Sequence, residues 1–277
     1  MLFDRRRVTL KSRSQIERMA EAGRLVGDAL DAIGEAIRPG ITPLELDAIA
    51  AEVIHSRGGS PSFIGVPGPL APFAHTVCVS LDDEVVHGVP DGRVIREGQL
   101  VSVDCGAIVD GWHGDSARTW LVGEVSEEAR RLSAATREAM LAGVTASVPG
   151  LTLEDVAGAI EDVGVAHGYG IVRAYVGHGI GNEMHEEPQV TNYRTGRRGR
   201  RIEPGLCIAI EPMFTLGGHE TRVKPDGWTV ATADGSLAAH WEHTIAITDD
   251  GPRILTLGRD EVAVATGVAV EAAEAVA

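Results

Sequence analysis

Two strand-like stretches joined by a tight turn occupy residues 100–121, and this hairpin constrains the fold more than any other feature. Apolar and polar residues alternate along the first stretch, which is the period of a strand with one buried face. Asp110-Gly111 is a favoured two-residue hairpin turn, so a second strand should run back over residues 112–122. We therefore expect an antiparallel pair in which residue 104 faces residue 117.

This pairing places two carboxylates on one face of the hairpin. Asp115 becomes a diagonal neighbour of Asp104, about 7–8 Å away. Two acids that point at one place from an interior strand are costly unless something positive lies between them. The pair therefore indicates a metal ion. The alternative is that Asp104 caps a loop and Asp115 is solvated, and a shift of the turn by one residue would separate them.

The composition limits the classes of protein to which the chain can belong. Its 277 residues allow one or two domains, and 44% hydrophobic with 4% aromatic residues predicts a core of Ala, Val, Ile and Leu. The net charge of −15 disfavours general nucleic-acid binding, which requires a basic surface. Cys78, Cys105 and Cys207 lack CxxC spacing and are expected to be reduced thiols. Without a signal peptide or an apolar run of about 18 residues, we expect a cytoplasmic protein with no membrane contact.

Two helix–turn–helix patterns follow one another along the chain, with similar turns at residues 39–42 (PGIT) and 149–152 (PGLT). Helices are expected from Ser14 to Ile37, from a capping box at Thr42 to about Ser56, from Ser126 to about Val148, and from Thr152 to about His167.

The repeat predicts an internal duplication. Asp104 and Glu211 follow the two turns at similar distances, although two such turns could also arise by chance. We expect one catalytic domain over residues 1–258, built from halves at about 14–123 and 124–258. Residues 259–277, rich in Ala, Val and Glu, are expected to form a terminal helix or a frayed tail without chemistry.

Further acids and a histidine occur in or beside strands. Strands are expected at 76–80, 84–87, 206–215, 228–232, 237–247 and 253–255, so Glu211 and Glu242 lie within strands, while His178 lies among glycines. Each has an ordinary explanation on its own, namely a solvated strand acid or a turn histidine. Together with Asp104 and Asp115 they form an oxygen-rich ligand set that suits a pair of divalent ions such as Mn²⁺, Fe²⁺ or Co²⁺.

The motifs VVHGVPDG, VSVDCG, DGWHGDSAR, GHGIG, MHEEPQV, IEPM and HWEHT, in this order, resemble those of type I methionine aminopeptidases over about residues 14–257. The resemblance implies the α+β pita-bread fold, in which two pseudo-twofold-related halves surround a central curved antiparallel sheet. It implies removal of the N-terminal (initiator) methionine from nascent proteins and peptides, with a small second residue preferred. It also implies attack by a water or hydroxide that bridges two metal ions, which could be Co²⁺, Mn²⁺, Fe²⁺ or Zn²⁺.

The resemblance also assigns roles to individual side chains. Asp104 matches a terminal ligand of one ion, His178 and Glu211 match ligands of the other, and Asp115 and Glu242 match bridging carboxylates. Glu211 matches the proton shuttle as well. Histidines and pocket residues that match the substrate-binding set are His87, His185, Phe73, Cys78, Met184 and Trp228.

The chain departs from its relatives around the methionine pocket. Leu70, in a loop rich in Pro and Gly, stands where a tyrosine wall is usual, and Met184 stands where an aromatic is common. The resemblance also implies a nearby monovalent-cation site, at which Asp82 replaces a common Asn. His113, His240 and His243 flank the ligands and are expected to support them at most.

Three alternatives concern the partner and the activity. Arg194–Arg201 is a basic run that is either a solvated loop or a contact to ribosomal RNA. A proline-specific aminopeptidase or prolidase would share the five ligands, and a non-catalytic binding module of the same fold would typically lose them. We expect a monomer that acts on N-terminal Met peptides and does not bind specific nucleic acids.

Overall fold

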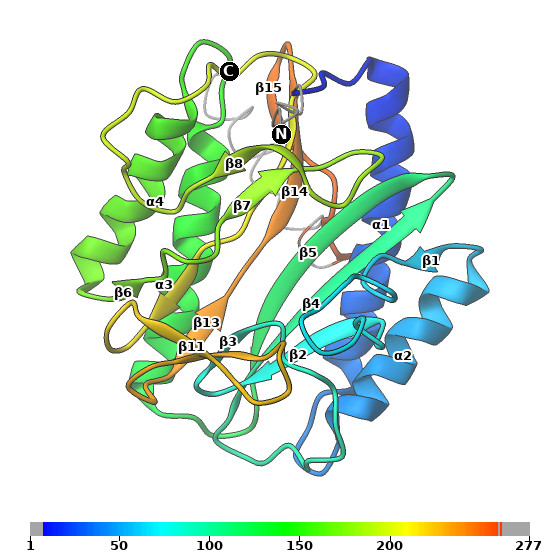
Figure 1. Cartoon of the computed structure of the whole chain (residues 1–277), viewed down its shortest axis with the longest axis vertical. Coiled ribbons are helices and arrows are strands. Elements are labelled where there is room, and N and C mark those ends of the chain that lie inside the picture. The colour runs from blue at the N-terminus through cyan, green and yellow to red at the C-terminus, as the bar shows by residue number, and fades with distance from the viewer. Residues whose placement is uncertain (1–7, 260, 262–277) are drawn as a thin grey trace, which may run out of the picture.

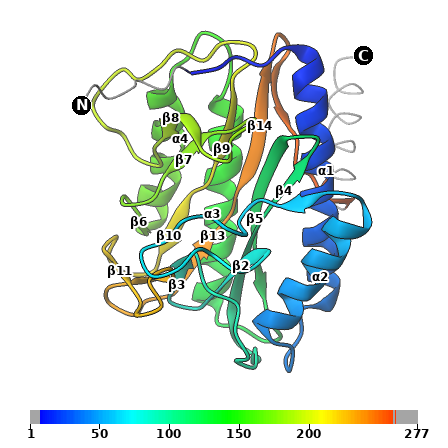
Figure 2. The same ribbon diagram turned by 45° about the vertical axis from the view of Figure 1, so that its right-hand side comes forward.

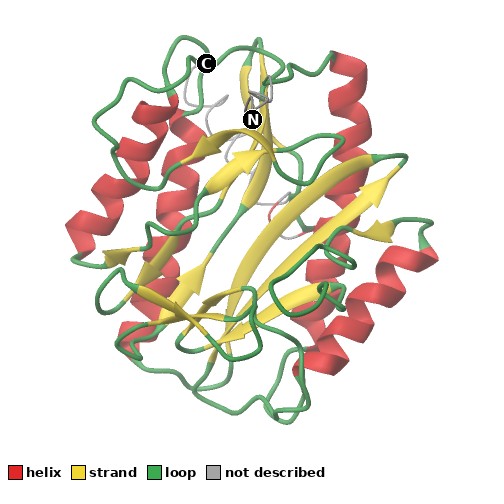
Figure 3. Cartoon of the chain, in the orientation of Figure 1, coloured by secondary structure: helices red, strands yellow, loops and turns green. Residues whose placement is uncertain are grey.

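The helices form two pairs on opposite sides of the strands (Figure 1). The computed structural model describes residues 8–259 and 261. Helices α1 (Arg13–Ala36) and α2 (Pro43–Ser56) lie on one side, and α3 (Glu127–Ala146) and α4 (Leu153–His167) on the other (Figure 3). The arrangement is α+β, as the repeated helix patterns predict. Within the described residues, no helix is long and apolar enough to cross a membrane.

The helices begin where their capping residues predict. Ser12 caps α1 and Thr42 caps α2, each in a reciprocal capping box with the residue three positions later. Ser126 accepts a hydrogen bond from the backbone at the start of α3. At α4 the carboxylate of Asp155 accepts a hydrogen bond from the backbone amide of Thr152. These contacts satisfy backbone donors that a helix start would otherwise leave unpaired.

The central hairpin has the predicted register. Its strands β4 (Leu100–Val109) and β5 (Trp112–Leu121) are antiparallel, with Asp104 opposite Ala117. Asp110 and Gly111 both have positive φ, as a two-residue turn between twisted strands requires. Asp104 and Asp115 therefore share one face of the hairpin.

All paired strands are antiparallel, and they form several short sheets around this hairpin. On one side, β4 also pairs with β1 and β2, and on the other a second sheet has the order β15-β14-β9-β7-β8. The bounds of the remaining strands are β1 (Ser60–Pro61), β2 (Val77–Leu81), β3 (Glu84–Val86), β6 (Gly170–Ile171), β7 (Gly177–Gly179), β8 (Glu186–Val190), β9 (Cys207–Ile210), β10 (Met213–Thr215), β11 (Thr221–Val223), β12 (Val230–Thr232), β13 (Ala238–His240), β14 (His243–Thr248) and β15 (Gly251–Ile254).

Two strands that the sequence predicts as continuous are broken, which corrects the expected ranges 206–215 and 237–247. The chain leaves β9 before Glu211-Pro212 and resumes in β10, and it leaves β13 before Trp241-Glu242 and resumes in β14. Pro212 has no amide hydrogen for a ladder. The amide of Glu242 donates instead to the carbonyl of Ala117 in β5. Each break therefore falls at a predicted ligand.

The core has two main parts, one under each helix pair. Leu30 of α1 and Ile54 of α2 pack against Val103 of β4, while Met140 of α3 and Ile160 of α4 pack in a cluster with β9 and β14. Helix α1 approaches the hairpin so closely that a Cβ on Gly114 would lie 2.7 Å from the backbone nitrogen of Gly23. The two layers therefore contact each other through backbone atoms, which holds β5 firmly in place.

The segment after β15 returns to α1. Arg259 pairs with Asp31 and Glu35 of α1, and Glu261 pairs with Arg118 of β5. Arg259 and Glu261, in a tail for which no chemistry is predicted, therefore help to hold the chain against α1 and β5. A terminal helix or frayed tail is expected over residues 259–277, of which residues 260 and 262–277 lie outside the described residues.

Candidate metal centre

Five side chains from five separate segments converge at the seam between the two sheets. Asp104 comes from β4, Asp115 from β5 and His178 from β7, while Glu211 follows β9 and Glu242 precedes β14. All five line one cavity of about 150 Å³. His178 Nε2 lies 3.7 Å from Asp115 Oδ2 and 3.6 Å from Glu211 Oε1. Asp115, His178 and Glu242 offer ligand atoms that all lie within 4.8 Å of one another. The structure thus gathers the whole predicted ligand set.

The four carboxylates repel one another in this buried setting. Burial and the neighbouring carboxylates raise the pKa values of Asp104, Glu211 and Glu242 well above their ordinary range. Burial raises the pKa of Asp115 to about 8. Three carboxylate oxygens, Asp104 Oδ1, Asp115 Oδ1 and Glu242 Oε1, find no hydrogen-bond partner among the described residues. Buried, unpartnered acceptors of this kind fit cations.

The histidine is held in the protonation state that a ligand needs. His178 Nδ1 donates to the backbone carbonyl of Gly179 at 2.9 Å, so its Nε2 faces the carboxylates without a proton. Burial lowers the pKa of His178 to about 4, which keeps the ring neutral. One neutral imidazole and four carboxylates are donors that suit hard divalent cations. The residues present therefore fit a divalent metal centre.

The two predicted non-ligand histidines lie at the same cavity. The His185 ring centroid lies 4.4 Å from that of His178, and the His87 ring packs edge-on against Tyr175 at 5.4 Å. His87 has a φ of 58°, which is uncommon for a residue with a side chain. Burial lowers the pKa of each to about 4. Both rings are therefore neutral at pH 7 and can donate one hydrogen bond each.

An apolar pocket adjoins the polar cluster. Its walls include the four residues predicted for it, Phe73, Cys78, Met184 and Trp228. The Phe73 ring packs edge-on against Trp228 at 5.1 Å. Trp228 Nε1 in turn donates to the carbonyl of Ala71. The pocket thus takes Phe73 and Cys78 from a loop and strand β2 of the first half, and Met184 and Trp228 from two loops of the second.

The prediction that Leu70 replaces a pocket wall is wrong. Leu70 is 72% exposed, and Phe63 and Val66 line the cavity instead. The amide of Phe73 donates to the carbonyl of Val66, which closes the base of the loop and leaves residues 67–72 outside the pocket. Sequence reasoning missed Phe63 and Val66 because a loop has no periodicity that shows which side chains point inward.

The flanking histidines support the strands around the cluster. His240 Nε2 lies 3.9 Å from Glu211 Oε2 and 4.0 Å from Glu242 Oε2. His113 Nδ1 is hydrogen-bonded to Ser62 Oγ, and His243 Nδ1 to Thr256 Oγ1. Asp82 accepts hydrogen bonds from the side chain of Gln99 and the backbone of Leu100, away from the five ligands.

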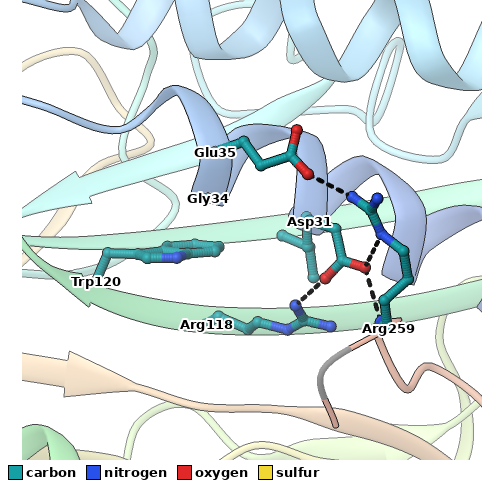
Figure 4. Close-up of a pocket in the computed structure, with 7 residues that line it drawn as sticks. Asp31, Gly34, Glu35, Arg118, Trp120 and Arg259 are labelled. Carbon is teal, nitrogen blue, oxygen red and sulfur yellow. Dashed lines mark hydrogen bonds and ion pairs between the residues drawn. The ribbon is translucent and has the colours of Figure 1, made fainter. Parts of the chain in front are cut away.

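A second cavity, of about 370 Å³, lies between α1 and β5 and contains none of the predicted site residues. Figure 4 shows that its polar groups already pair with one another: Asp31 accepts from Arg118 and Arg259, and Glu35 accepts from Arg259. Its charges stabilise the packing of α1 on β5.

An oxygen-rich cluster that fits divalent metal, at the seam of an antiparallel α+β fold, is an arrangement found in metal-dependent hydrolases. The sequence pattern of metallopeptidase family M24 matches residues 17–249, and the chain belongs to this family. Membership confirms the predicted metallopeptidase and the expectation of divalent metal.

Full-length relatives confirm the predicted resemblance. Methionine aminopeptidase 1 of Mycobacterium tuberculosis is 49% identical over 264 residues, which is 93% of this chain and 98% of the relative. The crystal structure of methionine aminopeptidase from Thermotoga maritima superposes with a TM-score of 0.87 at 40% identity and covers 91% of this chain and all of that one. An Xaa-Pro dipeptidase from Bacillus anthracis has a TM-score of 0.72 at 26% identity, with 89% of this chain and 61% of that one covered. The pita-bread fold is confirmed.

Proposed function

We propose that the chain removes N-terminal methionine from peptides and nascent proteins, with a preference for a small second residue. The observation that carries this proposal is the juxtaposition of five ligand-type side chains with an apolar pocket in one cavity. The pocket is lined by aromatic, aliphatic and sulfur-containing side chains, which suit an unbranched thioether chain. The polar cluster lies where the bond after that side chain would have to be cleaved.

The proposed ligands divide between two divalent ions. Asp104 would hold one ion, His178 and Glu211 the other, and Asp115 and Glu242 both. The chemistry that such ions supply, when bound, is acidification of a water and polarisation of a carbonyl group. The unpartnered oxygens of Asp104, Asp115 and Glu242 support this assignment.

The remaining steps fall to side chains of the chain itself. Glu211 lies at the cavity wall and would carry a proton to the leaving amine. His185 and His87, both neutral and both at the cavity, would donate hydrogen bonds to the scissile amide and to the oxygen on which negative charge develops. Phe73, Val66 and Met184 would hold the methionine side chain and so fix the position of the bond.

The decisive experiment compares two substrate classes under the same metal loading. The protein is reconstituted with Co²⁺, Mn²⁺, Fe²⁺ or Zn²⁺ in turn and given Met-Ala-Ser or an Xaa-Pro peptide. We expect release of methionine and little cleavage of Xaa-Pro. The reverse preference would assign the chain to the prolidase alternative. Equal rates for the parent and Asp115→Ala would point to a contaminant and favour a non-catalytic binding module.

We further infer that the enzyme works in the cytoplasm as a monomer, with residues 1–258 as one catalytic unit. All three cysteines lie in the described part of the chain and are free, buried thiols, which supports a reducing compartment.

A ribosome contact through Arg194–Arg201 is part of the same proposal. Arg194 is held by Glu161 and Asp162 of α4, whereas Arg197 and Arg198 are exposed and form no ion pair with described residues. Replacing Arg197 and Arg198 with Ser should weaken co-sedimentation with ribosomes and leave peptide hydrolysis unchanged. Unchanged co-sedimentation would leave the run as a solvated loop.

A further inference from the structure

The segment before α1 is tied to the loop that carries His185. In Figure 2 this blue segment runs from α1 across the top of the molecule toward β7 and β8. The backbone amide of Lys11 donates to the carbonyl of Gly205 at 2.7 Å. Lys11 Nζ donates to Glu186 Oε2 at 2.5 Å, and Thr9 Oγ1 donates to the same oxygen at 2.7 Å. The Lys11 side chain is only 4% exposed and that of Glu186 15%, so this ion pair is largely shielded from solvent.

The side chain of Glu186 is hydrogen-bonded to the loop between β7 and β8. Its Oε1 accepts from the amide of Glu183, and the carbonyl of Glu183 accepts from the amide of Gly181. Gly181 also lies beneath Lys11: a Cβ at position 181 would overlap both the Lys11 side chain and the Glu186 carboxylate. Lysine, glutamate and glycine therefore fill one small space, and removal of the lysine would leave a largely buried carboxylate without its cation.

This ion pair is next to His185 in the chain. Glu186 is the first residue of β8 and pairs with Gly179, so its backbone is fixed to the strand that carries His178. His185 immediately precedes Glu186 in the bend before β8, so fixing the Glu186 backbone and carboxylate also restrains His185, whose ring centroid lies 4.4 Å from that of His178.

We propose that Lys11 is a positioning residue for His185 and acts through the carboxylate of Glu186. The inference rests on the proposed function, in which His185 donates to the reacting amide. Lys11 does not line the cavity, so it does not touch substrate. A displaced catalytic group typically costs a large factor in rate, about 100-fold for 1 Å.

A double-mutant cycle tests this coupling at saturating metal. Lys11→Met should lower kcat for Met-Ala-Ser about 10- to 100-fold, with KM within about threefold. Lys11→Arg keeps the cation and should restore most of kcat. His185→Ala should lower kcat by itself, and Lys11→Met added to it should have no further effect, because the residue through which it acts is gone.

Amide hydrogen exchange gives a readout that is independent of activity. Lys11→Met should speed exchange in residues 181–187 and leave β14 and β15 unchanged, and Lys11→Arg should slow it again. The matched control is Arg253→Met, which breaks an exposed ion pair between β15 and Glu17 of α1 and should change neither quantity. If Lys11→Met does not fold, Thr9→Val removes the second donor to Glu186 and should lower kcat severalfold.

The outcomes distinguish failure of the positioning role from failure of the proposed function. A normal kcat and normal exchange in Lys11→Met, with His185→Ala impaired, would overturn the positioning role and leave the proposed function standing. Additive losses in the double variant would also overturn it, since Lys11 would then act elsewhere. If the parent released no methionine, the proposed function would fail, and unchanged exchange at residues 181–187 would still refute the positioning role.

Discussion

Ala117 of β5 and Glu242, the residue before β14, exchange two backbone hydrogen bonds. The amide of Glu242 donates to the carbonyl of Ala117 at 2.9 Å, and the amide of Ala117 donates back at 3.4 Å. Asp115 lies two residues before Ala117, on the same face of the strand. The two carboxylates proposed to bridge the metal ions are therefore placed by a direct backbone link between the two sheets, which limits how far they can move apart.

Asp115→Asn should abolish the response of the protein to divalent metal. A metal ion that binds only the folded state stabilises that state by about 2.7 kcal/mol when its free concentration is 100 times its Kd. For a domain of this size this raises the Tm by roughly 5–10 °C. We expect Mn²⁺ to raise the Tm of the parent by such an amount and that of Asp115→Asn by much less. Without metal the variant should melt higher than the parent, since one of four repelling carboxylates is gone. The control is Asp250→Asn in an exposed turn; an equal metal response in all three proteins would contradict the assignment.

Gly114→Ala should destabilise the fold because α1 leaves no room for a methyl group. Its Cβ would lie 2.7 Å from the Gly23 nitrogen and 2.9 Å from the Ala22 carbonyl carbon, both backbone atoms of a helix. Overpacking of this kind costs about 1–3 kcal/mol. Urea denaturation measures the loss. Gly92→Ala is the matched control, since a Cβ there meets nothing within 4 Å, and a loss of equal size in both variants would refute the close approach.

The two candidate pocket positions can be separated by truncation. Val66→Ala shortens a side chain that lines the cavity and should lower kcat/KM for Met-Ala-Ser about fivefold, from roughly 1 kcal/mol of lost apolar contact. Leu70→Ala changes a side chain that is 72% exposed and should have less than about a twofold effect. Steady-state kinetics on both variants decides the matter, and the opposite ranking would restore Leu70 to the pocket.

Glu84 should contribute stability that depends on pH. Burial raises its pKa, but hydrogen bonds from Arg93 and Lys224 outweigh burial and hold the pKa below the ordinary 4.5. A carboxylate whose pKa is lowered in the folded state makes its full contribution to the free energy of unfolding above pH 4.5. It loses that contribution as the pH falls through its folded-state pKa. Glu84→Gln should therefore cost about 2 kcal/mol at pH 7, allowing for the partly exposed arginine, and progressively less below pH 4.5.

Urea denaturation of parent and Glu84→Gln at pH 7 and at pH 3.5 measures this difference. Glu17→Gln, in an exposed ion pair with Arg253, serves as the control and should cost less than about 0.5 kcal/mol at either pH. A constant gap between the Glu84→Gln variant and the parent at both pH values would show that the charge of Glu84 is not what stabilises β3.

Local signals in the sequence were enough for the helix starts and the hairpin register. Thr42 and Ser126 cap helices because their side chains reach amides three residues away. The turn at Asp110-Gly111 is determined by the positive φ of these two residues themselves. The hairpin register alone brought Asp104 and Asp115 together. The roles of His178, Glu211 and Glu242 beside them followed from the resemblance to a known family.

Features that depend on distant parts of the chain were not predictable in this way. The break before Glu242 depends on Ala117, and the choice of Val66 over Leu70 depends on how the loop closes on Phe73. The pairing of Lys11 with Glu186 links segments that no local pattern connects. In each case a tertiary contact, invisible to periodicity, decides the local structure.

The backbone link between Ala117 and Glu242 also sets when the enzyme can become active during its own synthesis. Ribosomes release a chain from its N-terminus, so the hairpin with its two aspartates emerges long before the strand that follows Glu242. The early half presents only two of the five proposed ligands, Asp104 and Asp115, and lacks His178, Glu211 and Glu242, so it is a poor trap for a divalent cation. An enzyme proposed to trim newly made proteins therefore gains its full proposed ligand set only after the segment with Glu242 has been made.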